Sequence, residues 1–311
     1  MDKPIQGIHH ITAIVGNPQE NVDFYVDVLG LRLVKKTVNF DDPGTYHLYF
    51  GDKEGSPSTI MTTFPWDGAA KGRIGTGQVG VTSFVVPTGA IPFWEERLTK
   101  KQCYFEKGTR FNQEVVSFTD PHGLKLEIVA RDQGPKSEWS YEEITKDTAI
   151  KGFGGAILYT SSPDKTGELL TEVMGLEKVG TDGNFVRYQA EGELGNVIDL
   201  DTSVTEVGTL GVGTIHHIAW RAEDEQNQLD WHAHVGKYGY RATEVMDRQY
   251  FKAIYFREQG GLLFEIATDP PGFLWDESVE ELGTSLKLPP WLEPAREKIE
   301  NIVLPITIPK G

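Results

Sequence analysis

The sequence of 311 residues contains a single cysteine, Cys103. One thiol cannot form a disulfide within the chain, and such sparing use of cysteine is typical of proteins in reducing compartments. The first residues lack the basic stretch followed by an apolar stretch that marks a secretory signal. No apolar run approaches the ~18 residues that a membrane-spanning helix needs. We therefore expect a soluble, cytoplasmic protein without structural disulfides.

Basic residues are also in short supply. The chain has 30 lysines and arginines against 46 acidic residues, a net charge of −16. Nucleic acids and anionic membranes are bound through positively charged surfaces, so we expect neither as a partner. The hydrophobic content of 39% and aromatic content of 11% are those of a globular protein. The length suffices for two domains with a large buried core.

Histidine is scarce as well, yet its placement is not random. Four of the eight histidines form two pairs, in the stretches GIHHITAIV (residues 7–15) and TIHHIAWRA (residues 214–222). Both stretches read as short apolar strands. Their similarity across about two hundred residues indicates an internal repeat.

The repeat unit is a strand, a helix and three further strands. Four such βαβββ modules can be traced, at approximately residues 7–65, 77–131, 152–202 and 213–268. The second and fourth modules both end in Gly-Leu-x-x-Glu-Ile. We expect an α+β fold with one half at residues 1–136, a polar linker at 137–150, a second half at 151–269 and a C-terminal tail at 270–311.

These modules, with histidine in a first strand and glutamate in a last strand, resemble the vicinal oxygen chelate superfamily of glyoxalases and extradiol dioxygenases. The stretches GIHHIT, TIHHIAW, DRQYFKAIYF (residues 247–256) and GGLLFEIATDPPGF (residues 260–273) look like those of the ring-cleaving dioxygenases that act on hydroquinones. The resemblance covers nearly the whole chain. It implies two half-barrel domains and an extradiol-type reaction.

A candidate metal-ligand set follows from the alternation of side chains along strands. One histidine of each pair can point into a cavity. We expect this to be the second, His10 and His217, with Glu265 of the last strand as third ligand. Two neutral imidazoles and one carboxylate, with positions left open, suit Fe(II), and Mn(II) shares this preference. A carboxylate in an apolar strand is costly unless it is paired or coordinated.

The four modules differ in what they offer to a metal. Their first-strand positions hold, in chain order, His10, approximately Ser83, Gly155 and His217. Their last-strand positions hold no acid in the first module and then Glu127, Asp199 and Glu265. Only the first and fourth modules together complete the set. We therefore expect these two modules to pack against each other around the metal, and we interpret Glu127 and Asp199 as structural acids.

Further residues match the positions that the resembling family uses around its metal. His9 and His216 are expected to support the ligands, and one of them could act as a base. Tyr255 is a candidate acid or hydrogen-bond donor, or else a core aromatic residue. Arg248 could offset substrate charge, or else form a surface ion pair with Asp247 or a neighbour.

A second group of candidates would contact the substrate. Thr12 shares a strand face with His10 and could hydrogen-bond the substrate. Phe273 and Trp275 of the tail could close the pocket mouth, although they could equally cover the sheet. The remaining histidines are interpreted as structural: His47, His122, His232 and His234.

The expected function is an Fe(II)-dependent dioxygenase that opens the ring of hydroquinone-like or catechol-like aromatics with O2. One alternative is a glyoxalase-like lyase or isomerase, which would need a second carboxylate ligand. The first module has no acid in its likely last strand, SPSTIMTTF (residues 56–64). Another alternative is a quinone-binding or antibiotic-binding protein without turnover, which would need no metal triad. Exposed module edges suggest a homodimer.

Overall fold

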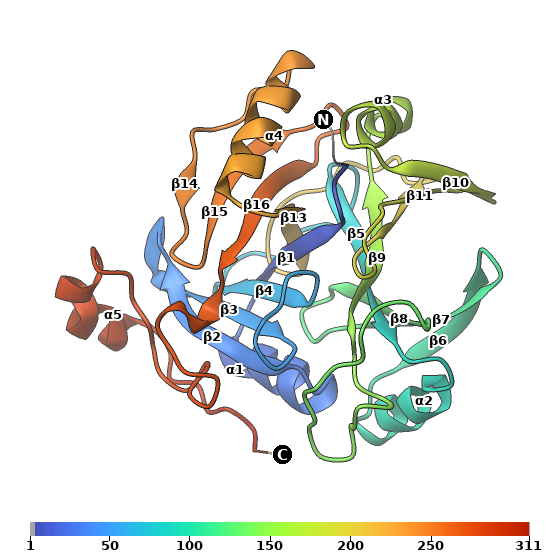
Figure 1. The fold of residues 1–311 in the computed structure, drawn as a ribbon. Helices are drawn as coiled ribbons and strands as arrows, with labels where there is room; N and C mark the ends of the chain where they lie inside the picture. Colours follow the sequence, from blue (N-terminus) through green and yellow to red (C-terminus); the bar gives the residue numbers. More distant parts are fainter. Residues whose placement is uncertain (1–3, 311) are drawn as a thin grey trace.

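The computed structural model describes residues 4–310, which form two eight-stranded sheets with helices packed outside them (Figure 1). Each sheet is built from two modules, and each module is a strand, a helix and three further strands. The expected α+β class with four βαβββ modules is confirmed.

The first and fourth modules form one sheet. The first comprises β1 (Ile8–Val15), α1 (Pro18–Val22), the π-helix η1 (Asp23–Val28), β2 (Arg32–Asn39), β3 (Asp42–Gly51) and β4 (Ile60–Pro65). The fourth comprises β13 (Thr214–Ala222), α4 (Glu225–Lys237), β14 (Met246–Asp247), β15 (Phe251–Arg257) and β16 (Leu263–Pro271). The strand order is β14-β15-β16-β13-β1-β4-β3-β2.

The second and third modules form the other sheet. The second comprises β5 (Gln78–Val86), α2 (Ile91–Lys100), β6 (Phe105–Arg110), β7 (Gln113–Thr119) and β8 (Lys125–Ala130). The third comprises β9 (Gly152–Tyr159), α3 (Pro163–Glu168), the π-helix η2 (Leu169–Val173), β10 (Glu177–Asp182), β11 (Phe185–Gln189) and β12 (Val197–Asp201). The strand order is β10-β11-β12-β9-β5-β8-β7-β6.

The predicted pairing of the first and fourth modules is confirmed. Figure 1 shows the blue β1 and β4 beside the orange β13 and β16. Strand β1 runs antiparallel to β13, with Thr12 opposite His217. Each sheet takes one module from each half of the chain, so β1–β13 and β5–β9 contacts join the halves. The domain boundaries around residues 137–150 stay a prediction.

Corresponding positions of the modules can be read from the parallel pairing of each first strand with its last strand. The pairs that correspond are Thr12–Thr62, Ser83–Glu127, Ile157–Asp199 and Ala219–Glu265. In each module, the position that corresponds to His10 lies two residues before the first-strand member of this pair. In the second module that position is Val81. The expectation of Ser83 there is wrong by two residues, and strand alternation could not separate the two positions because Val81 and Ser83 lie on the same face of β5. Thr62 is the counterpart of Glu265.

Alternation along β1 separates the core from the site. Ile11, Ala13 and Val15 belong to the main hydrophobic core, whereas His10 and Thr12 face the other side of the strand. The turn between β1 and α1 is fixed by Asn17, whose side chain accepts hydrogen bonds from two backbone N–H groups at the start of α1. Within residues 4–310, no helix has the length and apolarity to cross a membrane.

The C-terminal tail lies along the edge strand β2 (red beside blue in Figure 1). It contains the 3-10 helices η3 (Phe273–Trp275) and η4 (Glu293–Ala295) and the helix α5 (Arg296–Ile302). The backbone N–H of Lys287 donates to the carbonyl of Lys36 at 2.9 Å. The fully buried ammonium of Lys35 contacts the carboxylates of Asp276 and Glu277. The tail thus covers an edge that would otherwise expose unpaired backbone groups.

Candidate active site

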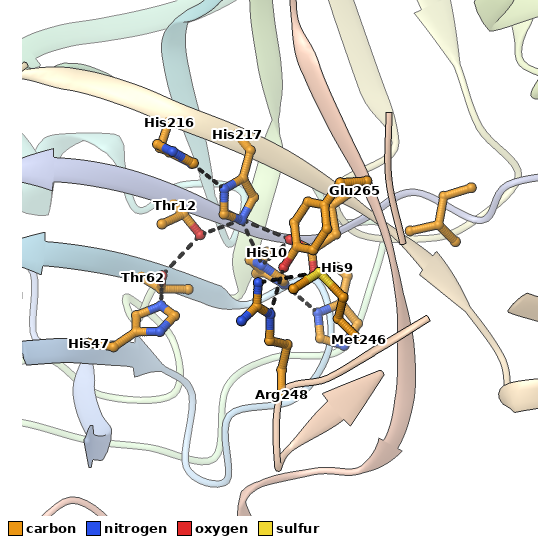
Figure 2. Close-up of polar contacts among 12 residues, drawn as sticks. His9, His10, Thr12, His47, Thr62, His216, His217, Met246, Arg248 and Glu265 are labelled. Carbon is orange, nitrogen blue, oxygen red and sulfur yellow. Dashed lines mark hydrogen bonds and ion pairs between the residues drawn. The ribbon is translucent and has the colours of Figure 1, made fainter. Parts of the chain in front are cut away.

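Three side chains of types that commonly bind metals meet on three adjacent central strands. His10 lies on β1, His217 on β13 and Glu265 on β16, and one potential ligand atom from each lies within 4.8 Å of the others. The two Nε2 atoms are 3.4 Å apart. The Oε2 atom of Glu265 lies 3.3 Å from Nε2 of His10 and 2.8 Å from Nε2 of His217. All three side chains are buried and point toward one another (Figure 2).

The donor atoms of this cluster fit a cation. Nδ1 of His10 is 2.9 Å from Nδ1 of His9, and Nδ1 of His217 is 2.8 Å from Nδ1 of His216. The Nδ1 atoms are thus engaged, and the Nε2 atoms face the centre. The carboxylate of Glu265 is fully buried, and its Oε2 faces the two Nε2 atoms. Burying a carboxylate is costly, and a divalent ion shared by these three groups would offset that cost.

The ionisation states also suit a metal. Burial opposes the charge on Glu265, but His10 and His217 outweigh it and hold the pKa of the carboxyl below its ordinary range. Burial lowers the pKa of His217 despite the nearby carboxylate. A carboxylate beside neutral imidazole is the protonation state in which these groups bind metals.

A cavity of about 240 Å³ opens on the donor cluster. Its walls are largely aromatic and are lined among others by Phe40, Tyr49, Phe64, Trp66, Phe251 and Tyr255. Larger hollows exist, including a groove of about 620 Å³ beside Lys53 and Lys136, but the three donors do not line them. The smaller cavity is therefore where bound metal and ligand would meet.

Tyr255 and Arg248 reach this cavity as a pair. Tyr255 lies on β15 opposite Glu265 on β16, and its Oη is 3.2 Å from Nε of Arg248. Burial and the charge of Glu265 raise the pKa of Tyr255, so its phenol is neutral. Nη1 of Arg248 is 3.0 Å from Oδ2 of Asp41. Arg248 forms this ion pair across the cavity rather than the local one with Asp247.

The other predicted neighbours of the ligands fall into two places. Oγ1 of Thr12 is 2.9 Å from Nε2 of His217, at the centre. His216 lines the cavity, and burial lowers its pKa to about 3. His9 stands behind His10 and packs against Phe251 with ring centres 5.5 Å apart. The first histidine of each pair thus contacts the Nδ1 of the second, and a supporting role for His9 and His216 stays a prediction.

The two tail residues expected at the pocket mouth do not line the cavity. Phe273 is buried behind Tyr49 and Tyr250, with ring centres 4.9 Å and 5.2 Å away. Trp275 is 64% exposed and faces solvent. The tail covers the sheet here, which is the alternative that the sequence left open.

The sequence interpretation missed several residues that line the cavity, among them Asp41 and His47. His47, interpreted as structural, lies on β3 and lines the cavity, with hydrogen bonds to Thr62 and Tyr49. The stretch TYHLY at residues 45–49 shows the alternation typical of a strand. The sequence does not indicate that β3 curves over the three donor side chains.

The corresponding position in the other sheet is filled by protein cations. Arg110 contacts both Glu127 and Asp199, and Arg187 binds Asp199 through two nitrogens at 2.7 Å and 2.8 Å. With Val81 in place of a histidine, this half has acids but no imidazole partners. The interpretation of Glu127 and Asp199 as structural acids agrees with these ion pairs.

Comparison with known proteins places this geometry in a family. The model of the Glyoxalase/Bleomycin resistance protein/Dioxygenase superfamily matches residues 7–128 and 152–276. The chain belongs to this superfamily. The resemblance drawn from the sequence is thereby confirmed.

Its relatives span its whole length. "Putative ring-cleaving dioxygenase MhqO" of Bacillus subtilis (strain 168) is 59% identical over 308 residues, covering 99% of both chains. "Chlorohydroquinone/hydroquinone 1,2-dioxygenase" of Sphingobium indicum is 37% identical over 308 residues, covering 95% of both. A crystal structure of a "putative dioxygenase" from Bacillus subtilis superposes with a TM-score of 0.98 at 58% identity, covering 99% of this chain and 100% of that one. Glyoxalase I from Zea mays shares only the fold, with a TM-score of 0.63 at 15% identity, covering 85% of this chain and 92% of that one.

Proposed function

We propose that this protein is an Fe(II)-dependent dioxygenase that opens the ring of hydroquinones with O2, holding the metal through His10, His217 and Glu265. Full-length similarity to ring-cleaving dioxygenases makes the chain an enzyme of that class. The observation that carries the finer proposal is the convergence of two imidazoles and a carboxylate at the base of a buried aromatic cavity. Mn(II) would fit the same donors.

Iron at this site would hold a ring hydroxyl and dioxygen side by side and carry electrons between them. The protein contributes orientation and charge. The guanidinium of Arg248 and the phenol of Tyr255 face the cavity next to the donors, where they stabilise a negatively charged oxygen on a bound aromatic. Thr12 offers a hydroxyl 2.9 Å from Nε2 of His217.

The cavity selects for size and shape. At about 240 Å³ it is smaller than the pockets of about 300–1,000 Å³ that bind drug-sized ligands, so it suits a single ring. Phe64, Trp66 and Phe251 provide flat apolar surface for that ring. Asp41 and Asn39 lie in the wall as polar groups that could bind a second hydroxyl. This arrangement supports hydroquinone as substrate and leaves catechol as the comparison to test.

A glyoxalase-like isomerase is disfavoured by the position of Thr62. A four-ligand site would take a second carboxylate from the first module, at the counterpart of Glu265. That counterpart is Thr62, and β4 contains no acid. A protein that only binds aromatic compounds would not need two imidazoles and a carboxylate buried beside one another, because burying the carboxylate is costly.

The test is oxygen uptake by the metal-loaded protein. Protein purified under argon is assayed for iron and manganese, then mixed with hydroquinone or catechol in an oxygen-electrode cell. We expect Fe(II)-dependent uptake with hydroquinone and a product heavier by two oxygen atoms. His217→Ala should abolish uptake, whereas His232→Gln on α4 should not. Uptake that survives removal of all metal would refute the proposal.

A further inference from the structure

A chain of hydrogen bonds crosses four strands and ends at the centre. Oη of Tyr49 is 2.9 Å from Nδ1 of His47, whose Nε2 is 2.7 Å from Oγ1 of Thr62. Thr62 donates to Oγ1 of Thr12 at 3.0 Å, and Thr12 is 2.9 Å from Nε2 of His217. Figure 2 shows its labelled members, from His47 through Thr62 and Thr12 to His217.

Sheet register makes this chain a fixed feature. Tyr49 on β3 is opposite Thr62 on β4, Thr62 is opposite Thr12 on β1, and Thr12 is opposite His217 on β13. Tyr49, Thr62 and Thr12 are at most 1% exposed. Without water to compete, each polar atom depends on its neighbour in the chain.

Counting protons gives the chain a direction. Thr62 has one hydroxyl proton, which it donates to Thr12, so it must accept from His47 at Nε2. Burial lowers the pKa of His47 well below its ordinary value, so the ring is neutral and Nδ1 is an acceptor for the phenol of Tyr49. Every donor then points toward the centre. In the reverse direction the buried phenol proton of Tyr49 would have no acceptor within residues 4–310, because His47 Nδ1 would itself be a donor.

A metal on His217 changes only the last link. Its Nε2 would no longer accept from Thr12, whereas Thr62 would still donate to Thr12. Thr12 is fully buried and does not line the cavity, so its proton would be left to an oxygen atom held at the centre beside His217. Thr62 occupies the counterpart position of Glu265, so a hydroxyl in a hydrogen-bond chain stands where a fourth ligand would be.

We propose that Tyr49, His47 and Thr62 are positioning residues that hold the Thr12 hydroxyl as a donor to an oxygen of the aromatic substrate beside His217. This inference rests on the proposed function and assigns His47 and Thr62 a part in it. Neither residue needs to touch the reacting atoms.

Substitutions at Thr62 test this chain of hydrogen bonds, and valine has nearly the same volume as threonine. Thr62→Val removes the hydroxyl, and Thr62→Ser retains it. Thr63→Val is the control, because Thr63 is equally buried on the other face of β4 and bonds Asn21 instead. Hydroquinone binding to the Fe(II)-loaded protein under argon should weaken about 3- to 10-fold in Thr62→Val and recover in Thr62→Ser. Thr62→Val combined with Thr12→Val should bind no more weakly than Thr12→Val alone.

The pair His47→Gln and His47→Leu tests the next link. A glutamine amide can still donate to Thr62, and leucine cannot. We expect iron content to stay at the wild-type level in both, with hydroquinone affinity retained in His47→Gln and reduced in His47→Leu. Equal affinity in Thr62→Val, His47→Leu and wild type would overturn the proposal.

The direction of the chain can be read without turnover. In the Zn(II)-loaded, ¹⁵N-labelled protein, long-range ¹⁵N–¹H spectra report which ring nitrogen of His47 carries the proton. We expect Nε2–H, with the signal identified by its loss in His47→Gln. An Nδ1–H ring would overturn the inference whatever the activity. Absence of oxygen uptake in the wild-type protein would refute the proposed function alone, because neither the spectrum nor binding under argon requires it.

Discussion

His10 and His217 are separated by 207 positions in the chain, yet their Nε2 atoms lie 3.4 Å apart. The antiparallel pairing of β1 with β13 brings them together, and the parallel pairing of β13 with β16 adds Glu265. Because backbone hydrogen bonds of the central strands set these positions, the sheet itself brings the three side chains together. Such preorganisation favours one geometry for a metal.

Glu265→Gln tests the carboxylate as a ligand. The amide keeps the shape of the side chain but loses the charge that a divalent ion needs. We expect iron affinity and oxygen uptake to fall by about 100-fold or more, since even indirect disturbance of a metal site costs about 10- to 100-fold. Metal analysis after dialysis is the measurement, with His232→Gln as the unaffected control. Full iron content in Glu265→Gln would exclude Glu265 as a ligand.

Tyr255→Phe tests the phenol next to the centre. Loss of a hydroxyl that donates to substrate oxygen should lower kcat by about 100-fold while iron content stays unchanged. Tyr250→Phe is the matched control, because the Tyr250 hydroxyl is bonded to Asp276 and does not line the cavity. Steady-state oxygen uptake separates kcat from KM. An equal loss in both variants would indicate a packing effect rather than a role for the Tyr255 hydroxyl.

Thr62→Glu tests the three-ligand character of the site. A carboxylate at the counterpart of Glu265 should act as a fourth protein ligand. Iron should then be bound more tightly, and a position otherwise open to hydroquinone should be lost. We expect tenfold or greater loss of oxygen uptake together with slower removal of iron by a chelator. Thr62→Gln supplies the same volume without the charge. Faster iron loss in Thr62→Glu than in Thr62→Gln would contradict this prediction.

Asp120 gives the fold a pH dependence away from the site. Burial raises its pKa to about 7, even though Oδ1 accepts backbone N–H groups of His122 and Leu124. A raised carboxyl pKa means that the folded state binds the proton more tightly than the unfolded state does. Its stabilising contribution is therefore complete below the ordinary value of 3.8 and is lost as the pH rises through about 7.

Asp120→Asn mimics the protonated form and should remove this dependence. Relative to the variant, the wild-type protein should lose up to about 4 kcal/mol of unfolding free energy between pH 4 and pH 8. Urea unfolding of both proteins at a series of pH values measures the difference and cancels the contribution of other groups. Parallel stability curves across that range would contradict the raised pKa.

Lys35→Met tests how the tail is held. The Lys35 ammonium is fully buried against Asp276 and Glu277, so its removal leaves two carboxylates without their partner. We expect a loss of about 3–5 kcal/mol in unfolding free energy and faster proteolysis within the tail. Lys146→Met is the control, because Lys146 pairs with Glu138 at the surface and should contribute less than about 1 kcal/mol. Equal stability of the two variants would sink the assignment.

The metal donors could be predicted from the sequence because they depend on local rules. Strand alternation and the repeat select His10 and His217, and the absence of other complete ligand sets selects the pairing of modules. The structure brings those residues together with Glu265. Their role as ligands stays a prediction until metal is measured.

What the sequence did not reveal depends on register and curvature. Ser83 was placed at the histidine position instead of Val81 because strand alternation gives the face of a residue and not its partner on the neighbouring strand. His47 and Asp41 were missed because they lie near the centre only through the curl of β3 and its hairpin over the cavity. Phe273 was predicted to lie at the pocket mouth because it is close to Glu265 in the sequence. In the structure it packs behind Tyr49.

The sheet that carries His10, His217 and Glu265 combines strands from the first and the fourth module, and this affects how it can form during synthesis. The other sheet is contiguous, between Gln78 and Asp201, and can form as soon as that segment exists. Strands β1 and β4, by contrast, have an open edge until β13 is made about two hundred residues later. Closing so long a loop is slow. A ribosome-bound or truncated chain that ends before Glu265 therefore lacks the third of the proposed metal ligands.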